Sequence, residues 1–320
     1  MALLAVMTIA VVGLALCRIC FAADASASAA DIDTSAALMA ADRMETLCCG
    51  VVSGSDISME QSAFRTDFVP REPEYVERFR NYDGVKADFV PVLMYHFFYD
   101  ANTEEPTKGA NSHSIQSVRA QLQWFWEHEY VTLTMDELYE WLCGNIELPA
   151  KCVLLTSDDG KDNFFELLQP ELHKYGYVAT SFVITAWRKN LDYKLTLPNV
   201  ELHSHTDNMH KGKVKTGGVP TNRGMMQGVS VEAGVNDLTE SSRKLGGSRY
   251  FAYPYGTYGG NSKEILRQAG FRLAFTTTPG VVRRGDDPLQ LNRLRICGSI
   301  FDNKIKHVVR YPQIEKKYGQ

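Results

Sequence analysis

The sequence lacks a long basic stripe, and this argues against a nucleic-acid partner. Its 34 Lys and Arg residues are outnumbered by 38 Asp and Glu, which leaves a formal net charge of −4 over 320 residues. Proteins that bind phosphate backbones usually gather Lys and Arg on one face or along one helix. The short basic cluster HKGKVK at 210–215 is more typical of a solvated loop, so no nucleic acid is expected.

Cysteine is too scattered for a disulfide scaffold. Two of the seven cysteines, Cys17 and Cys20, form a CxxC, but no strand and helix surround it, as a redox motif requires. Cys143 and Cys152 flank an apolar strand and could pair outside the cell, although isolated buried thiols explain them equally well. The content of 44% hydrophobic and 22% charged residues is that of an ordinary globular protein.

The N-terminus carries a long apolar run, ALLAVMTIAVVGLALC, followed by the small and polar residues CRICFAADASASAAD. This order resembles a signal peptide followed by its cleavage sites, and a run extended to Ala23 would be long enough to span a membrane. No Lys or Arg precedes the run, and a buried core helix is the alternative. We expect residues 1–23 to be a signal peptide or membrane anchor, which places the protein outside the cell or in the cell envelope.

Residues 24–88 are expected to form a linker or stalk and a region that no pattern assigns. From Phe89 onward, apolar strands alternate with helices. The run CVLLT is continuously apolar, as in parallel strands that are buried on both faces. Strand candidates of this kind also occur in VPVLMYH, TSFVITAW, VELHSH, YFAYPYG and LAFTTT.

Helix signals lie between these strands. Helical spacing groups five apolar residues on one face of SIQSVRAQLQWFWEHEY, namely Ile115, Val118, Leu122, Phe125 and Trp126. Thr134 and Glu137 have the spacing of a capping box, and Asn261 is expected to cap NSKEILRQAG. NFFELLQPELHKYG predicts a helix that a proline makes irregular. Alternating strands and helices predict a parallel α/β sheet or barrel.

Polar residues follow the C-terminal ends of four strand candidates. His96 ends VLMYH, Asp158 and Asp159 follow VLLTS, His205 follows VELHS, and Tyr255 follows YFAYP. In α/β barrels these ends form the active face. The four strands are therefore expected to direct their polar residues to one rim.

The two adjacent acids of the DDG run repel each other and resist burial, and a bound cation would compensate for both effects. His205 and His210 are five residues apart, which excludes the helical HExxH arrangement. A strand end that leads into a turn can still bring both imidazoles together. Two imidazoles and one carboxylate suit zinc, with a position left for water. His203 lies two residues before His205, so on a strand it would face the same side.

Four motifs carry a family resemblance. TSDDG, SHTDNMH and FAYPYG resemble the motifs of the polysaccharide deacetylases, the NodB-homology or carbohydrate esterase family 4 group. VPVLMYH, placed before them, resembles the poly-N-acetylglucosamine deacetylase subgroup. The resemblance covers about residues 89–300 and implies a NodB-homology domain over 89–315, folded as a distorted (β/α) barrel. It also implies metal-dependent hydrolysis of N-acetyl groups on polysaccharides that contain N-acetylglucosamine.

The resemblance assigns the residues around the metal. The first acid of the DDG motif, Asp158, takes the place of the general base. The second acid, Asp159, takes the place of a metal ligand, together with His205 and His210. Zn²⁺ is the expected cation, with Co²⁺ and Ni²⁺ as alternatives, because ligand type narrows the choice of metal without fixing it.

The resemblance also implies a general acid and an oxyanion donor, and three positions differ from the family pattern or compensate for a difference. His96 takes the place of the general acid, and the backbone N–H of Tyr255 that of an oxyanion donor. Ser157 stands where the family usually has Phe. Ala252 stands where many members have an arginine that orients the base, and Arg293 is the candidate to replace that arginine.

Two alternatives from other classes remain open at this point. An O-acetyl carbohydrate esterase would use the same machinery, and a catalytically inactive carbohydrate-binding protein could share the fold. In all three cases the partner is a polysaccharide, acetylated in the two enzymes, and a monomer is expected. The sequence does not identify the polymer, because peptidoglycan, exopolysaccharide and chitin all contain N-acetylglucosamine.

Overall fold

The computed structural model describes residues 76–296, apart from residues 105, 107–108, 211, 217–218 and 224. The predicted export segment, the stalk and the CxxC lie outside the described residues. Within the described part, no helix is both long and apolar enough to cross a membrane.

Seven parallel strands of the described part close into a barrel, which confirms the predicted (β/α) architecture. Their order is β1-β12-β11-β10-β7-β6-β5, and pairing of β1 with β5 closes the ring. The strands are β1 (Val92–Tyr95), β5 (Cys152–Ser157), β6 (Ala179–Val183), β7 (Val200–Ser204), β10 (Tyr250–Ala252), β11 (Leu273–Pro279) and β12 (Leu291–Arg295).

Two irregularities distort the barrel. The short strand β4 (Val131–Thr132) pairs with the first residues of β5, whereas β6 pairs with its last residues. The pairing of β11 with β12 shifts register between Phe275 and Pro279. Neighbouring strands therefore do not run alongside each other over their full length.

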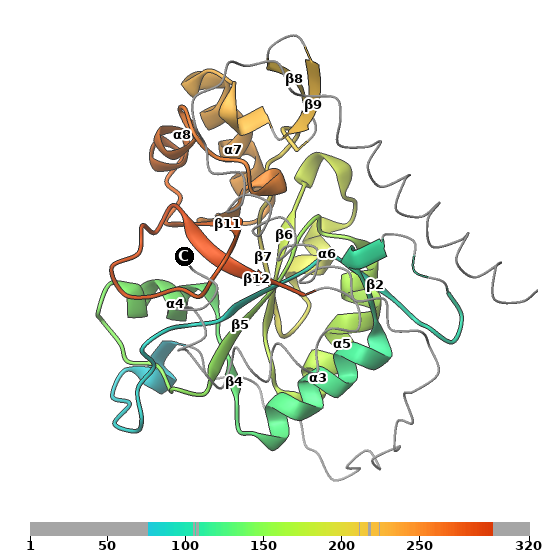
Figure 1. Cartoon of the computed structure of the whole chain (residues 1–320), viewed down its shortest axis with the longest axis vertical. Coiled ribbons are helices and arrows are strands. Elements are labelled where there is room, and N and C mark those ends of the chain that lie inside the picture. The colour runs from blue at the N-terminus through green and yellow to red at the C-terminus, as the bar shows by residue number, and fades with distance from the viewer. Residues whose placement is uncertain are drawn as a thin grey trace, which may run out of the picture. The chain divides into compact units, whose positions relative to one another are not determined.

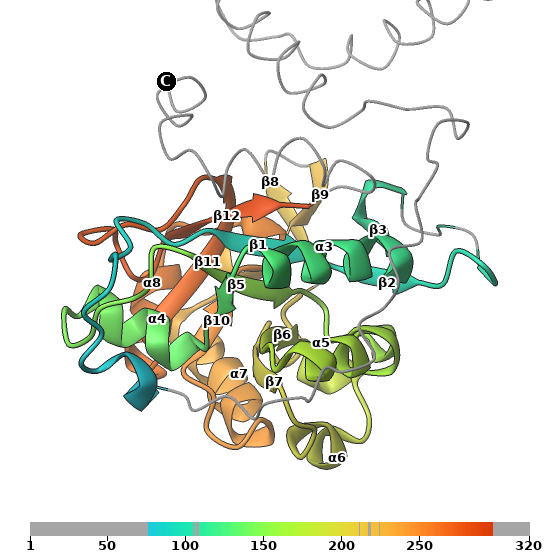
Figure 2. The ribbon, with the colours of Figure 1, turned by 90° about the horizontal axis from the view of Figure 1, so that it is seen from below.

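Helices connect most of these strands. They are α3 (Ile115–Glu127), α4 (Met135–Leu142), the π-helical segment η3 (Phe164–Leu168), α5 (Gln169–Tyr175), α6 (Leu191–Leu195), α7 (Val231–Lys244) and α8 (Ser262–Gln268). Helices α3 and α5 lie side by side, and so do α7 and α8 (Figure 1). Figure 2 shows the barrel strands at the centre, with α3 and α5 on one side and α4 and α8 on the other.

Short 3₁₀ turns and two small strand pairs lie outside the barrel strands and the main helices. The 3₁₀ turns are η1 (Val76–Phe79), η2 (Gly109–Asn111), η4 (Thr185–Trp187), η5 (Met225–Gln227) and η6 (Pro254–Gly256). Strands β2 (Phe97–Tyr99) and β3 (Ser112–Ser114) form a parallel pair, and β8 (Gly212–Thr216) and β9 (Val219–Arg223) form an antiparallel hairpin.

Alternation along the strands separates two apolar layers. Val92, Leu154 and Phe182 belong to one buried cluster, together with residues of β10, β11 and β12. Their neighbours Leu93 and Leu155 belong to a second cluster, which contains the buried face of α3. Both faces of these strands are therefore buried, which explains why the strand runs are apolar without a break.

The helix predictions hold in part. The capping box is confirmed, because the backbone N–H of Glu137 donates to Thr134 Oγ1 over 3.1 Å and the backbone N–H of Thr134 donates to Glu137 Oε2 over 2.9 Å. Trp126 was wrongly placed on the buried face of α3 and is 37% exposed. Asn261 precedes α8 but makes no side-chain capping bond. The proline irregularity is confirmed as a π-helical turn ahead of α5.

Residues 76–88 belong to the region that the sequence left unassigned, and they pack on the barrel. Phe79 and Ala87 are buried in the same cluster as Trp141 of α4. The backbone N–H of Ala87 donates to the Leu148 carbonyl over 2.8 Å. Residues 76–88 therefore contribute to the apolar core.

Cys143 and Cys152 do not pair, which corrects the suggested disulfide. Cys143 lies exposed at the end of α4, whereas Cys152 is buried at the start of β5. Burial raises the pKa of the Cys152 thiol to about 12. A thiol of that pKa is unreactive at neutral pH, so Cys152 acts as a core residue.

Glu201 of β7 generates a prediction about stability. Its Oε2 accepts hydrogen bonds from the backbone N–H of Met135 over 2.9 Å and from Thr180 Oγ1 over 3.1 Å. Burial raises the pKa of Glu201 from 4.5 to about 8. The folded state keeps this proton where the unfolded state loses it, so the free energy of unfolding should fall as the pH rises from about 4.5 to about 8.

The variant Glu201→Gln keeps an acceptor oxygen and removes the titration. We expect its Tm to match that of the wild type near pH 5 and to exceed it at pH 8. Thermal melts across this range, with the exposed Glu232→Gln as the matched control, measure the difference. A Tm difference that does not change with pH would show that Glu201 does not titrate in this window.

Candidate active site

The C-terminal ends of the barrel strands bring most of the predicted residues together. His96 Nε2 lies 3.9 Å from Asp158 Oδ2. His205 Nε2 and His210 Nε2 lie 3.7 and 3.2 Å from Asp159 Oδ1. These residues come from the ends of β1, β5 and β7 and from the loop after β7. Chain segments more than a hundred residues apart thus supply one cluster of titratable groups.

Asp158 is held by Arg293 of β12. Both side chains are almost fully buried, at 3% and 0% exposure. Nη1 and Nη2 of Arg293 donate to the two carboxylate oxygens over 2.7 Å each. Burial by itself would raise the pKa of Asp158, but the charge and hydrogen bonds of Arg293 outweigh it and hold this pKa below its usual range. Asp158 is therefore a fixed carboxylate at neutral pH.

Arg293 is itself fixed by further contacts. Its Nε donates to the carbonyl of Thr276 over 2.9 Å, and its Nη1 also donates to Thr156 Oγ1 over 3.2 Å. A bidentate pair of this kind sets orientation as well as charge. Arg293 thus supplies the guanidinium group that contacts Asp158.

Asp159 faces a different set of partners, although it is the next residue. One ligand atom from each of Asp159, His205 and His210 lies within 4.8 Å of the others. Burial would raise the pKa of Asp159, but the hydrogen bond with His210 and the charges of both histidines lower it below its usual range. The two adjacent acids therefore have separate sets of partners.

The backbone explains how neighbouring acids can point to different partners. Asp159 has a φ of 74°, and Gly160 has a φ of 61°. Such left-handed residues are uncommon outside glycine and often mark functional sites. A Cβ at Gly160 would lie 2.8 Å from Val183 Cγ1. The glycine of the DDG motif is therefore required both by its conformation and by the close approach of β6.

The donor set fits a divalent metal ion. Nδ1 of His205 donates to the carbonyl of Ala252 over 2.7 Å, which leaves Nε2 as the unprotonated nitrogen on the side of Asp159. Burial lowers the pKa of His205 to about 4, so the ring is neutral. A hydrogen bond that fixes the tautomer in this way is usual behind metal-binding histidines. Two imidazoles and a carboxylate are a donor set that zinc accepts.

His96 lies beside Asp158 and comes before the metal-ligand candidates in the sequence. Its side chain is 19% exposed, and burial lowers its pKa, while the charges of Asp158 and Asp159 raise it. Ser157 Oγ donates to the backbone carbonyl of His96 over 3.3 Å. The serine that replaces the family's phenylalanine therefore links the ends of β1 and β5.

Tyr255 lies in a strained turn next to His210. Its φ is 59°, that of Gly256 is 69°, and its ring centroid is 4.8 Å from that of His210. A Cβ at Gly256 would come within 2.1 Å of Thr277 Oγ1, so the turn is pressed against β11. The backbone of Tyr255 is thereby fixed beside the metal-ligand candidates, while its side chain is 47% exposed.

Sequence reasoning missed Arg188, which braces the left-handed turn. Its Nε donates to the backbone carbonyl of Asp159 over 2.9 Å, and its Nη1 donates to the carbonyl of Trp187 over 3.1 Å. The residue follows η4 and belongs to none of the four motifs. Only the fold reveals its contact with Asp159.

The loop that carries His210 is anchored by residues of α7, which sequence reasoning also missed. The carboxylate of Asp237 accepts the backbone N–H groups of Asp207 and Asn208 over 2.8 Å each. Asp207 Oδ1 in turn accepts Thr185 Oγ1 over 2.5 Å and Lys244 Nζ over 2.7 Å. These bonds fix the path from His205 to His210, which the spacing of five residues alone does not determine.

His203 does not join the site, contrary to the expectation from its position. Its Nδ1 lies 3.2 Å from Ser248 Oγ, and its ring packs edge-on against Tyr250 with a centroid distance of 4.8 Å. Strand β7 ends at Ser204, so residues 203 and 205 lie at different depths along the barrel. Side-chain alternation predicted that His203 and His205 share a face of the strand, but it did not predict how far apart they lie along the barrel axis.

Comparison with known proteins finds a matching family model and similar sequences. A family model described as polysaccharide deacetylase matches residues 145–274. The chain is 26% identical over 265 residues to a poly-beta-1,6-N-acetyl-D-glucosamine N-deacetylase of Staphylococcus aureus, which covers 75% of this chain and 86% of that protein.

Solved structures show the same similarity. The deacetylase PplD of Streptococcus pyogenes, in complex with acetate, has a TM-score of 0.56 at 25% identity, over 65% of this chain and 92% of that chain. IcaB from Ammonifex degensii has a TM-score of 0.58 at 25% identity, over 72% of this chain and 100% of that chain.

The separate surroundings of the two acids generate a prediction. Asp159→Asn should weaken divalent-metal affinity by at least about 100-fold, since even outer contacts to metal ligands are worth 10–100-fold. Asp158→Asn should keep the metal affinity within about tenfold but leave Arg293 buried without its partner, which costs about 3–5 kcal/mol of stability.

Competition with a chromogenic chelator measures the affinities, and thermal melts measure the stabilities. If the two variants lose equal metal affinity, the division between the acids is incorrect.

Proposed function

Because the chain belongs to the polysaccharide deacetylase family, we propose that it removes N-acetyl groups from a polysaccharide that contains N-acetylglucosamine. The observation that carries this proposal is the separate surroundings of two adjacent acids: Asp158 is paired with Arg293, whereas Asp159 faces His205 and His210. One rim thus offers a proton acceptor and a set of metal ligands. Similarity to a protein named for poly-beta-1,6-N-acetyl-D-glucosamine favours that polymer among the candidates.

Asp159, His205 and His210 would hold the divalent ion, which we propose to be Zn²⁺, with Co²⁺ or Ni²⁺ as alternatives. When bound, such an ion supplies Lewis acidity toward the acetyl carbonyl and makes water more acidic. The protein's own contribution is to orient these three side chains through the Ala252 carbonyl, Arg188 and the anchored loop.

Asp158 is proposed to accept the proton of the attacking water. Arg293 keeps the carboxylate ionised and fixes the direction of both oxygens. A base must be unprotonated and within reach of its proton to contribute to catalysis. The water oxygen forms a bond to the acetyl carbon, and the negative charge that develops on the carbonyl oxygen needs a donor. The backbone N–H of Tyr255, in its fixed left-handed turn, is proposed as that donor.

His96 is proposed to protonate the departing nitrogen as the carbon–nitrogen bond breaks. An amide anion is a very poor leaving group, so this proton must be delivered. Burial lowers the pKa of His96 below its usual range, and the charges of Asp158 and Asp159 offset part of this effect. The products are acetate and a free amino sugar, and the proton taken from water balances the one given to the amine.

Two aromatic rings beside His210 provide faces for a sugar. Trp187 is 36% exposed, and its ring centroid lies 5.4 Å from that of His210; Tyr255 is 47% exposed at 4.8 Å. Trp187 Nε1 donates to Asn208 Oδ1 over 3.2 Å, which fixes its ring. A polymeric acetylated sugar also agrees with the envelope or extracellular location that residues 1–23 predict.

A substrate panel tests the proposed activity. We expect the full chain to release acetate from β-1,6-linked N-acetylglucosamine oligomers, to lose this activity after a strong chelator, and to regain it with Zn²⁺. Oligomers with O-acetyl groups and chitin oligomers serve as comparison substrates. Turnover of O-acetyl sugars alone, or full turnover after verified metal removal, would overturn the proposal.

The role of His96 generates a second prediction. General-acid assistance is worth roughly 10²–10⁴-fold, so His96→Ala should lose about that factor on the N-acetyl oligomer. On an activated aryl acetate, whose leaving group needs little protonation, the loss should stay below about tenfold. His128→Ala, at the end of α3, is the matched control. Equal losses on both substrates, with an unchanged Tm, would remove His96 from the catalytic residues.

A further inference from the structure

A second pocket lies away from the proposed reaction site. Its volume is about 470 Å³, within the range of 300–1,000 Å³ that is typical of small-molecule sites. Arg249 and Arg272 directly precede β10 and β11, whereas the proposed catalytic residues follow the C-terminal ends of strands. Because the strands are parallel, the pocket opens at the opposite end of the barrel. Its lining is Arg80, Asp136, Glu140, Asn145, Ile146, His203, Gly247, Arg249, Tyr250 and Arg272.

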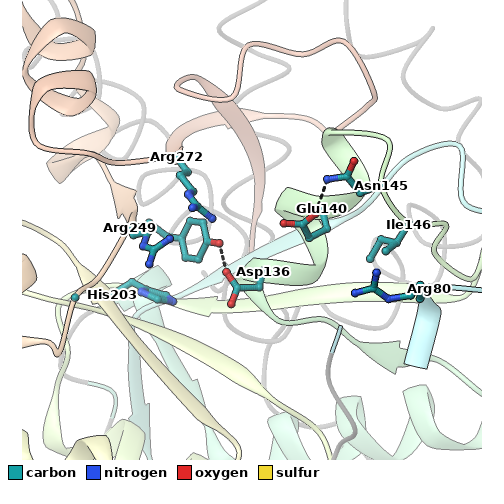
Figure 3. A pocket seen from close by; sticks show the side chains of 10 residues that line it. Arg80, Asp136, Glu140, Asn145, Ile146, His203, Arg249 and Arg272 are labelled. Carbon is teal, nitrogen blue, oxygen red and sulfur yellow. Dashed lines mark hydrogen bonds between the residues drawn. The ribbon is translucent and has the colours of Figure 1, made fainter. Parts of the chain in front are cut away.

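Arginine is the dominant charged residue of this lining. Arg249 and Arg272 make no ion pair with any residue that the structure describes, and Arg80 lies on the other side of the pocket (Figure 3). The guanidinium carbon of Arg272 lies 4.8 Å from the centre of the Tyr139 ring, which limits the orientations of this side chain. Arg249 and Arg272 thus offer two forked donors to the pocket, neither of them in an ion pair with a described residue.

The two carboxylates of the pocket are engaged with neutral donors. Asp136 accepts the hydroxyl of Tyr250, and Glu140 accepts Asn145 Nδ2 over 2.6 Å (Figure 3). A carboxylate has about four lone-pair positions, so each keeps capacity for a further hydroxyl donor. The pocket therefore combines donors for an oxyanion, on Arg249 and Arg272, with acceptors for hydroxyl groups, on Asp136 and Glu140.

We propose that this pocket binds a sugar that carries an anionic group, either a carboxylate or a phosphate. The guanidinium forks of Arg249 and Arg272 suit the planar or tetrahedral oxygens of such a group. Asp136 and Glu140 accept hydroxyls of the same ring. An uncharged sugar would leave the guanidinium forks of Arg249 and Arg272 without an ion-pair partner, and a bare anion would leave the remaining lone pairs of Asp136 and Glu140 without a hydroxyl donor.

The pocket also accounts for His203, which the proposed reaction does not use. Its ring lines the pocket, and its Nδ1 is occupied by Ser248. Binding here requires neither the metal ligands nor Asp158, so this inference is independent of the proposed deacetylation.

Calorimetric titration of the full chain tests the site with defined probes. Glucuronate and glucosamine 6-phosphate represent the carboxylate and phosphate arms, and glucose and inorganic phosphate represent their separate parts. We expect at least one sugar anion to bind at least about tenfold more tightly than either glucose or inorganic phosphate. The arm that binds identifies the anionic group.

Matched variants locate the binding. Arg249→Gln changes an exposed side chain and should weaken the bound sugar anion by at least about tenfold, with acetate release from the oligomer unchanged. Arg272→Lys tests the fork geometry and should weaken the phosphate or carboxylate contact less. Arg243→Gln, an exposed arginine of α7 paired with Glu240, is the control and should bind as the wild type does.

The proposal would be overturned if neither sugar anion bound at about 10 mM, if the affinity were unchanged in Arg249→Gln and Arg272→Lys, or if inorganic phosphate bound as tightly as the sugar phosphate. A sugar anion that competes instead with the oligomer for the reaction site, with unchanged affinity in Arg249→Gln, would likewise assign the binding elsewhere.

Discussion

The buried pair of Arg293 and Asp158 is the interaction on which the rest of the site depends. A carboxylate at 3% exposure costs several kcal/mol to desolvate, and only an equally well-placed cation offsets that cost. Arg293 meets this condition with two hydrogen bonds of 2.7 Å. The pair also joins β12 to β5, the two strands that flank β1 where the barrel closes. Closure of the barrel and ionisation of the proposed base therefore support each other.

Because Arg293 neutralises the charge of Asp158, the adjacent Asp159 is available to bind the proposed metal ion. If Arg293 did not neutralise one acid, both charges would have to be met by the same cation. The left-handed turn at Asp159 separates the two side chains, and Arg188 holds that turn through the Asp159 carbonyl. The histidines are then positioned by the Ala252 carbonyl and by the loop that Asp237 anchors.

The sequence predicted the parts of this account that depend on local pattern. Unbroken apolar strands, a capping box and polar residues at strand ends led to a parallel barrel with Asp158 and His96 on one rim. Contacts between distant segments were not readable. The choice of Arg293 followed from a missing arginine at Ala252, and no pattern pointed to Arg188 or Asp237. The two wrong predictions have the same origin. Trp126 and His203 follow the expected spacing, but the neighbours that surround a side chain depend on distant parts of the fold.

The position of the metal relative to the two acids tests the central claim most directly. Crystals of the full chain soaked in Zn²⁺, with diffraction recorded at the zinc edge, would show where the ion lies. The account predicts one anomalous peak at about 2.0–2.2 Å from ligand atoms of Asp159, His205 and His210, with Asp158 still paired to Arg293. A peak coordinated by Asp158, with Arg293 displaced from it, or no peak at these residues, would contradict the account.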